Sequence, residues 1–199
     1  ANNGEYILIS DLDVNGGTTS ALAATRATGN AGNGTTINLN GYTITLKTNL
    51  TIPEGKTVII NNDPVDDAAD KLGAVVNDGG KIINNGTLNI EGGEFGENTI
   101  ENNNGVVNIT GGTFESNPSD FVDDDYFVVE GEDGVCTIER KPQDLIDFEN
   151  AIENGGNVTL SDDITLLETV VIEEGNTVNL NLNGKTITGL KVDQSKNAM

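Results

Sequence analysis

The side chains that could do chemistry in this sequence are almost all carboxylates. Ten Lys and Arg stand against 32 Asp and Glu, which gives a net charge of −22, and the sequence has no His. A Ser-His-Asp triad, a Cys-His pair and a His-ligated zinc site are therefore excluded. The single cysteine, Cys136, cannot form an internal disulfide or a thiolate cluster. Because Cys136 lies in an apolar segment, we interpret it as a buried small residue.

Clustered aspartates are the candidate Ca²⁺ ligands, since Ca²⁺ takes roughly six to eight oxygen ligands from carboxylates and carbonyls. The best candidates are Asp120, Asp123, Asp124 and Asp125, followed by Asp66, Asp67 and Asp70. Neither group has the spacing of an EF-hand loop or of the nonapeptide Ca²⁺-binding repeat. We therefore interpret these aspartates as surface charge that maintains solubility, and we assign no metal, no cofactor and no catalytic residue.

A glycosidase could use two of these carboxylates if they lay about 5 to 9.5 Å apart across a groove. The pairs Asp66-Asp67 and Asp162-Asp163 could supply them, but no aromatic platform for a sugar accompanies either pair. Tyr42, predicted to be exposed, is a candidate for stacking on a glycan ring. The sequence favours solvated loops at the aspartate pairs.

The composition restricts which partners the chain can bind and which folds it can adopt. The excess of acidic residues, with a pI near 4.1, opposes binding to nucleic acid and to anionic membrane surfaces. No apolar run approaches the roughly 18 residues needed to span a bilayer. Only 35% of the residues are hydrophobic and 25 are Gly, while short apolar runs are cut by Asn, Gly or Asp. This composition is typical of many short strands joined by tight turns.

Internal repeats indicate how these strands are organised. Residues 84–95 return as 103–114 with identity at eight of twelve positions. We align the earlier runs 37–39, 58–60 and 82–83 with the same pattern, which predicts coils of about 19 to 23 residues. Strands of a parallel β-solenoid fit this period, with alternate side chains pointing inward. The pattern predicts a stacked ladder of Asn85 on Asn104 and a stack of Phe95 on Phe114.

A longer-range repeat predicts two modules. Residues 38–45 return as 181–188 with seven of eight identities, and 52–58 return as 172–178. We place the first module at 1–140 and the start of a second at 141–199. Each module is expected to begin with a capping helix, at about 18–27 and 144–153, and a hairpin at about 126–138 closes the first.

Three stretches carry a resemblance to a known family: 52–58, 181–188, and 111–138, which begins Gly111-Gly112-Thr113-Phe114. They resemble the pectate-lyase-like right-handed parallel β-helices of repetitive bacterial surface proteins, especially adhesin-like proteins. Phage tail spikes and virion fibres contain similar solenoids. The resemblance implies an all-β, right-handed parallel β-helix with short capping helices.

The resemblance also bears on catalysis. Pectate lyases of this fold use Ca²⁺-binding aspartates and an Arg base on a coil. Here Arg26 falls in the first predicted capping helix and Arg140 between the modules. The related hydrolases use a Gly-His-Gly step, which a chain without His cannot supply. We therefore expect this chain not to be an enzyme.

The function expected from the sequence is a non-enzymatic, extracellular structural or adhesion module displayed on a bacterial cell surface. Its partner would be a host glycan or a protein surface. One alternative is a virion fibre, spike or capsid-decoration protein, which predicts a homotrimer or docking onto capsid or tail proteins. The other alternative is a polysaccharide-binding or polysaccharide-degrading β-helix.

Overall fold

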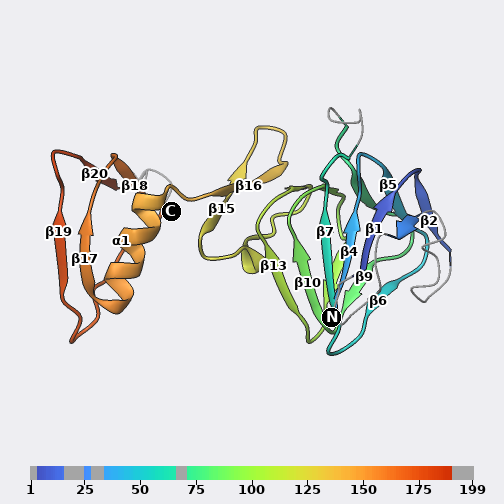
Figure 1. The fold of residues 1–199 in the computed structure, drawn as a ribbon, viewed down its shortest axis with the longest axis horizontal. Coiled ribbons are helices and arrows are strands. Elements are labelled where there is room, and N and C mark those ends of the chain that lie inside the picture. The colour runs from blue at the N-terminus through green and yellow to red at the C-terminus, as the bar shows by residue number, and fades with distance from the viewer. Residues whose placement is uncertain (1–3, 16–24, 28–33, 66–70, 190–199) are drawn as a thin grey trace, which may run out of the picture. The chain divides into compact units, whose positions relative to one another are not determined.

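Short strands in parallel sheets dominate the computed structural model, which describes residues 4–15, 25–27, 34–65 and 71–189 (Figure 1). Within these residues there is one α-helix, and a 3-10 helix forms a single turn. The chain divides into two compact units, Ala1–Arg140 and Lys141–Met199. We refer to them as unit 1 and unit 2 and describe each by itself.

Unit 1 holds sixteen described strands and the 3-10 helix. Its strands are β1 Gly4–Leu8, β2 Leu12–Val14, β3 Thr25–Ala27, β4 Gly34–Asn38, β5 Thr43–Leu46, β6 Leu50–Ile52, β7 Thr57–Asn61, β8 Ala74–Asn77, β9 Ile82–Asn84, β10 Thr87–Ile90, β11 Glu94–Phe95, β12 Ile100–Asn102, β13 Val106–Ile109, β14 Thr113–Phe114, β15 Tyr126–Glu130 and β16 Cys136–Arg140. The 3-10 helix η2 spans Ser119–Phe121.

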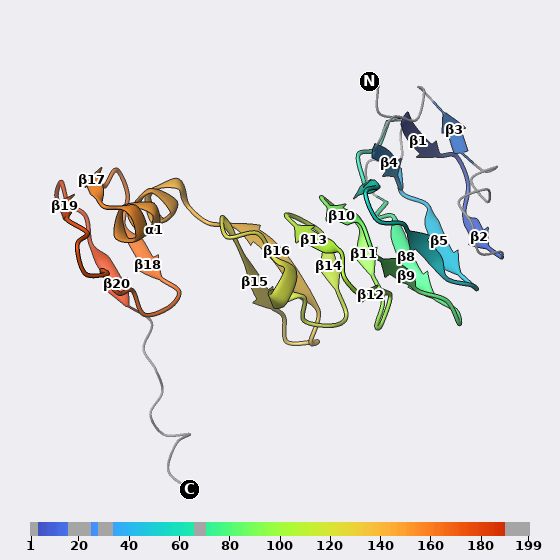
Figure 2. The same ribbon diagram turned by 90° about the horizontal axis from the view of Figure 1, so that it is seen from below.

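These strands form three sheets. Their orders are β13-β10-β7-β4-β1-β3, β15-β16-β14-β11-β8-β5-β2 and β12-β9-β6. Figure 2 shows the strands of the second sheet side by side. Within the described part of unit 1, pairing is parallel except where β3, β15 and β16 are involved.

The repeat of 84–95 at 103–114 corresponds to neighbouring strands in register. Leu88 aligns with Val107 and Ile90 with Ile109, and all four side chains are buried. In the next sheet, the rings of Phe95 and Phe114 stack with centroids 5.0 Å apart. The alternation of inward apolar residues and the aromatic stack are therefore confirmed.

The predicted coil period is wrong for part of unit 1. Val58 pairs with Leu88 and not with the run at 82–83, so this coil is longer than the repeat predicts. Ile82 lies in a different sheet, where it pairs with Leu50. The aligned runs look alike because every inward-facing strand needs alternating apolar residues, whichever sheet it belongs to.

Asparagine ladders form, but at other positions than Asn85 and Asn104. The Asn84 amide donates to Asn102 Oδ1 at 3.0 Å, and the Asn108 amide donates to Asn89 Oδ1 at 2.9 Å. Asn84 has no exposed surface, and its Oδ1 also accepts the Gly86 N–H. Each ladder satisfies polar groups that the stacking of strands removes from water.

Unit 2 contains α1 Gln143–Asn154, β17 Gly156–Thr159, β18 Ile164–Leu166, β19 Val178–Asn181 and β20 Ile187–Gly189. Strands β17 and β19 pair in parallel, as do β18 and β20. The apolar face of α1 packs with these strands around buried Phe148, Leu160 and Ile164. Helix α1 overlaps the expected helix at 144–153.

The long-range repeat encodes the same turn in both units. Asn40 and Asn183 both have positive φ angles, of 47° and 49°, and each is followed by a glycine with positive φ. The Asn40 amide donates to the Leu8 carbonyl at 3.0 Å, and the Asn183 amide donates to the Leu160 carbonyl at 3.1 Å. Asn and Gly occur here because they tolerate the left-handed region at little cost.

The helix expected at 18–27 is wrong over its last three residues, which form β3 antiparallel to β1. A single hydrogen-bonded partner strand outweighs the weak helix preference of so short a segment. Residues 18–24 lie outside the described residues. The antiparallel pair β15 and β16 lies at the expected hairpin, 126–138, and β16 extends to Arg140.

Candidate functional site

The four aspartates singled out as Ca²⁺ ligands lie in or just after η2. Asp120 lies in η2 and is exposed, as are Asp123 and Asp124. The Asp123 carboxylate accepts the Asp125 backbone N–H at 3.1 Å, so it fixes a local turn. Across the described ranges, no group of three or more acidic, His or Cys side chains is placed to hold a metal ion. Residues 66, 67 and 70 lie outside those ranges.

The pair Asp162-Asp163 has a structural contact on each side. Asp163 Oδ1 accepts the backbone N–H of Thr186 at 2.7 Å, and Asp162 Oδ1 lies 3.9 Å from Lys185 Nζ. Asp11 makes the equivalent bond in unit 1, to Thr43 N–H at 2.8 Å. These aspartates therefore connect neighbouring strands.

The other singled-out residues also have structural settings. Cys136 is buried, and this burial raises the pKa of its thiol, with nearby Glu130 acting in the same direction. Arg140 ends strand β16. Tyr42 is half-buried and packs against the core of unit 1, so the prediction of an exposed aromatic ring is wrong. Arg26 lies in β3, not in a helix.

A concave feature lies at the end of unit 1, beside β12. We call it the β12 cavity; its volume is about 150 Å³ and it is partly open to solvent. It is lined by the apolar residues Phe95, Ile100, Ile109, Phe114, Pro118 and Phe121 and, toward its polar parts, by Asn98, Thr99, Ser116 and Asn117. A cavity of about this volume has room for a benzene-sized group.

The cavity forms because the strand stack ends there. After β14, residues 115–121 do not add a strand to β12 but turn through η2. This cavity was not predicted from the sequence, although the repeat ending at residue 114 could have indicated that the next coil is incomplete.

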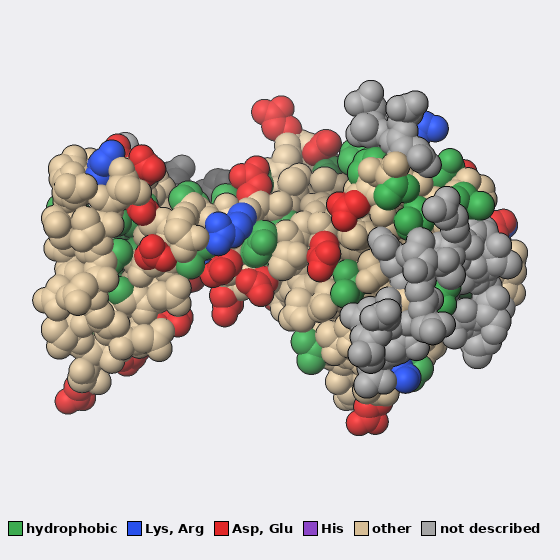
Figure 3. All heavy atoms as spheres, in the orientation of Figure 1, with side chains coloured by type: hydrophobic (Ala, Val, Ile, Leu, Met, Phe, Trp, Pro, Cys, Tyr) green, Lys and Arg blue, Asp and Glu red, His purple; other side chains and the backbone are tan. Residues whose placement is uncertain are grey.

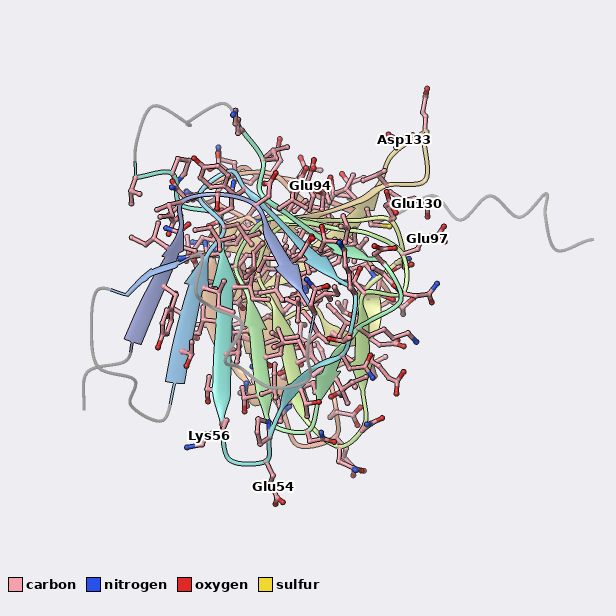
Figure 4. The ribbon with its side chains drawn as sticks, turned by 90° about the vertical axis from the view of Figure 1, so that its right-hand side faces the viewer. Glu54, Lys56, Glu94, Glu97, Glu130 and Asp133 are labelled. Carbon is pink, nitrogen blue, oxygen red and sulfur yellow. The ribbon has the colours of Figure 1, made fainter. Side chains whose placement is uncertain are left out.

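On the face of unit 1 that Figure 3 shows, acidic side chains are scattered over the surface and basic ones are few. Glu97, Glu130 and Asp133 lie on one side of the unit, as Figure 4 shows, while Glu54 and Lys56 project from a turn elsewhere. Some of the few cations are already paired: Lys47 Nζ lies 2.6 Å from Asp13, and Lys81 Nζ lies 3.1 Å from Glu101.

Comparisons with known proteins return no matching family model, no matching curated protein and no matching solved structure. Among the described helices, none has the length and apolar character needed to cross a membrane.

Proposed function

We propose that this chain is a non-enzymatic, extracellular structural or adhesion module displayed on a bacterial cell surface, built as a right-handed parallel β-helix. The observation that carries the proposal is the in-register stacking of equivalent side chains, between β10 and β13 and between β11 and β14. Such stacking gives a stiff scaffold with repeated faces, in which each layer depends mainly on its neighbours. Scaffolds of this kind suit presentation of a binding surface.

The distribution of charge supports the same proposal. A parallel stack ends in strands whose backbone groups can pair with other chains, which is a hazard for a displayed protein. A net charge of −22 opposes such association between copies. The aspartate pair at 162–163 connects strands of unit 2, a structural use of carboxylates that could otherwise serve catalysis.

Surface display is tested on intact cells of the source organism with antibodies raised against the purified chain. Labelling of intact cells, lost after brief external protease treatment, is the expected result. Labelling that requires lysis would contradict the proposal. Labelling of purified virions, together with a trimer by light scattering, would instead support the virion-fibre alternative.

The non-enzymatic part is tested separately, by incubating the chain with polyuronates and following new reducing ends and the absorbance of unsaturated products. We expect no turnover above a heat-denatured control. Turnover would contradict this part and support the polysaccharide-degrading alternative.

A further inference from the structure

Among the described strands, none pairs with β12 on its outer side. Strand β12 ends the sheet β12-β9-β6. At the same end of unit 1 the other two sheets are covered: β14 pairs with β16, and Ile109 forms a bridge with Val122. Of the three sheets, only the one that ends in β12 has no strand or bridge paired with it at this end of the described structure; the loop 116–121 lies across the β12 cavity from it.

The hydrogen bonds to β9 and its flanking residues show which groups of β12 face outward. Ile82 N–H donates to the Thr99 carbonyl at 2.8 Å, and Asn103 N–H donates to the Asn84 carbonyl at 3.1 Å. In a parallel pair, successive residues direct their backbone groups alternately to the two sides. Residues 99, 101 and 103 therefore face β9, and the N–H and C=O groups of Ile100 and Asn102 face away from it.

The burial of the side chains also shows that β12 lies at an edge. Ile82, between two strands, is fully buried, whereas Ile100, its partner in β12, is only partly buried and lines the β12 cavity. Among the described residues, no hydrogen bond joins the loop 116–121 to β12. A row of outward backbone groups thus lies beside a cavity with an apolar part.

The segment 81–84, which contains β9, shows what kind of chain fits an edge of β12. It places Ile82 in the core and Lys81 against Glu101, with Nζ and Oε2 3.1 Å apart. The outer edge of β12 offers the same combination, because Ile100, Phe114 and Phe121 give the cavity an apolar part, and Glu97 and Glu115 lie next to its lining residues in the sequence. Both glutamates are exposed, and the Glu115 carboxylate accepts the Glu97 N–H at 3.0 Å. The complementary ligand is an extended, basic chain with an aliphatic side chain.

We propose that the free edge of β12 binds an extended basic segment of another protein as an added strand, with one aliphatic side chain of that segment in the β12 cavity. Main-chain hydrogen bonds supply affinity in such strand addition, and the side-chain pocket and surrounding charge supply specificity. This inference does not rest on where the protein is located, since it concerns one edge of unit 1.

The test uses the whole chain and a synthetic probe. The probe is an acetylated, amidated peptide with the sequence of residues 80–85 and one additional lysine at each end. Binding is followed by fluorescence anisotropy of the labelled peptide and by amide NMR shifts of the chain. We expect saturable binding, with the largest shifts and new exchange protection at the amides of Ile100 and Asn102.

Two variants and one matched control locate the site. Glu97→Lys reverses a charge beside the cavity, and Ser116→Trp fills the cavity from its exposed rim; we expect each to weaken binding about tenfold or more. Glu54→Lys makes the same charge change at an exposed turn elsewhere and should leave the affinity unchanged (Figure 4). Unchanged circular dichroism and melting midpoints verify that the variants fold.

Several results would overturn the proposal. They are the absence of saturable binding at about 1 mM peptide, equal weakening by Glu54→Lys, amide shifts confined to other strands, and equal binding of a peptide with both isoleucines replaced by serine. Surface display could be disproved on cells while this binding is retained, so the two proposals fail independently.

Discussion

Replacing Asn84 with aspartate tests whether the buried asparagine ladder holds unit 1 together. The Asn84 amide group donates to Asn102 Oδ1 at 3.0 Å and to the Val106 carbonyl at 2.9 Å. In Asn84→Asp a carboxylate oxygen replaces that donor and faces two acceptors without any solvent exposure. Leaving a buried group unsatisfied costs about 1–3 kcal/mol, so two lost donations amount to roughly 4 kcal/mol.

Asn89→Asp is the matched control. Asn89 Oδ1 accepts the Asn108 amide at 2.9 Å, and a carboxylate keeps this acceptor. We expect a change of less than about 1 kcal/mol there. Both free energies of unfolding are measured by guanidinium titration at pH 8 and pH 5, followed by far-ultraviolet circular dichroism.

The two variants should also differ in their response to pH. Protonation of the carboxyl introduced at position 84 restores a donor, so the destabilisation of Asn84→Asp should shrink as the pH falls. Equal destabilisation by both substitutions, or none at position 84, would refute the reasoning that unit 1 needs a hydrogen-bond donor at position 84 but only an acceptor at position 89.

The remaining predictions concern packing, pH and thiol reactivity. Val107→Ala should lower the free energy of unfolding by about 2 kcal/mol in a guanidinium titration, and Val106→Ala should lower it by less than about 0.5 kcal/mol. The reason is that the Val107 side chain is 7% exposed and that of Val106 is 55% exposed. Equal losses would contradict the alternation of inward and outward side chains. The Asp144 carboxylate accepts the N–H groups of residues 162 and 161, which hold its pKa below the usual 3.8. Its stabilisation is therefore complete above that ordinary pKa and is lost as the pH falls through the lowered value. Asp144→Asn should lower the thermal midpoint of unit 2 at pH 7, and this effect should shrink as the pH falls below 3.8. Asp147→Asn on the same helix should lower the midpoint little at any of these pH values. Buried Cys136, with its raised thiol pKa, should react with a disulfide reagent only when unit 1 unfolds, so rapid reaction of the native chain would contradict the structure.

The local pattern could be predicted because it depends on neighbours in sequence. Alternation at Leu88 and Ile90 specifies an inward face for any strand in this register, and the glycine after Asn40 specifies a left-handed turn. The hairpin region and the helix before β17 are recognisable for the same reason, through turn residues and the spacing of apolar side chains.

Pairing between strands could not be predicted with the same success. Val58 pairs with Leu88 because a long connection between β7 and β8 extends that coil beyond the predicted period, and apolar alternation carries no information on such a length. Asn84, and not Asn85, enters a ladder because its side chain points into the stack, and a shift by one residue reverses which face a side chain occupies.

Composition and repeats were sufficient to predict a strand-rich, acidic chain with stacked layers, because these properties follow from residue types and their spacing. The tertiary structure alone decided where the stack ends. Whether β12 acquires a neighbour depends on the path of residues 115–121 in three dimensions, and that path leaves a cavity between Phe95, Phe114 and Phe121. A cavity or an unpaired strand edge arises where segments of the folded chain do not pack against each other. A sequence pattern shows which residues can pair or pack, but it does not show which of them stay unpaired in the fold.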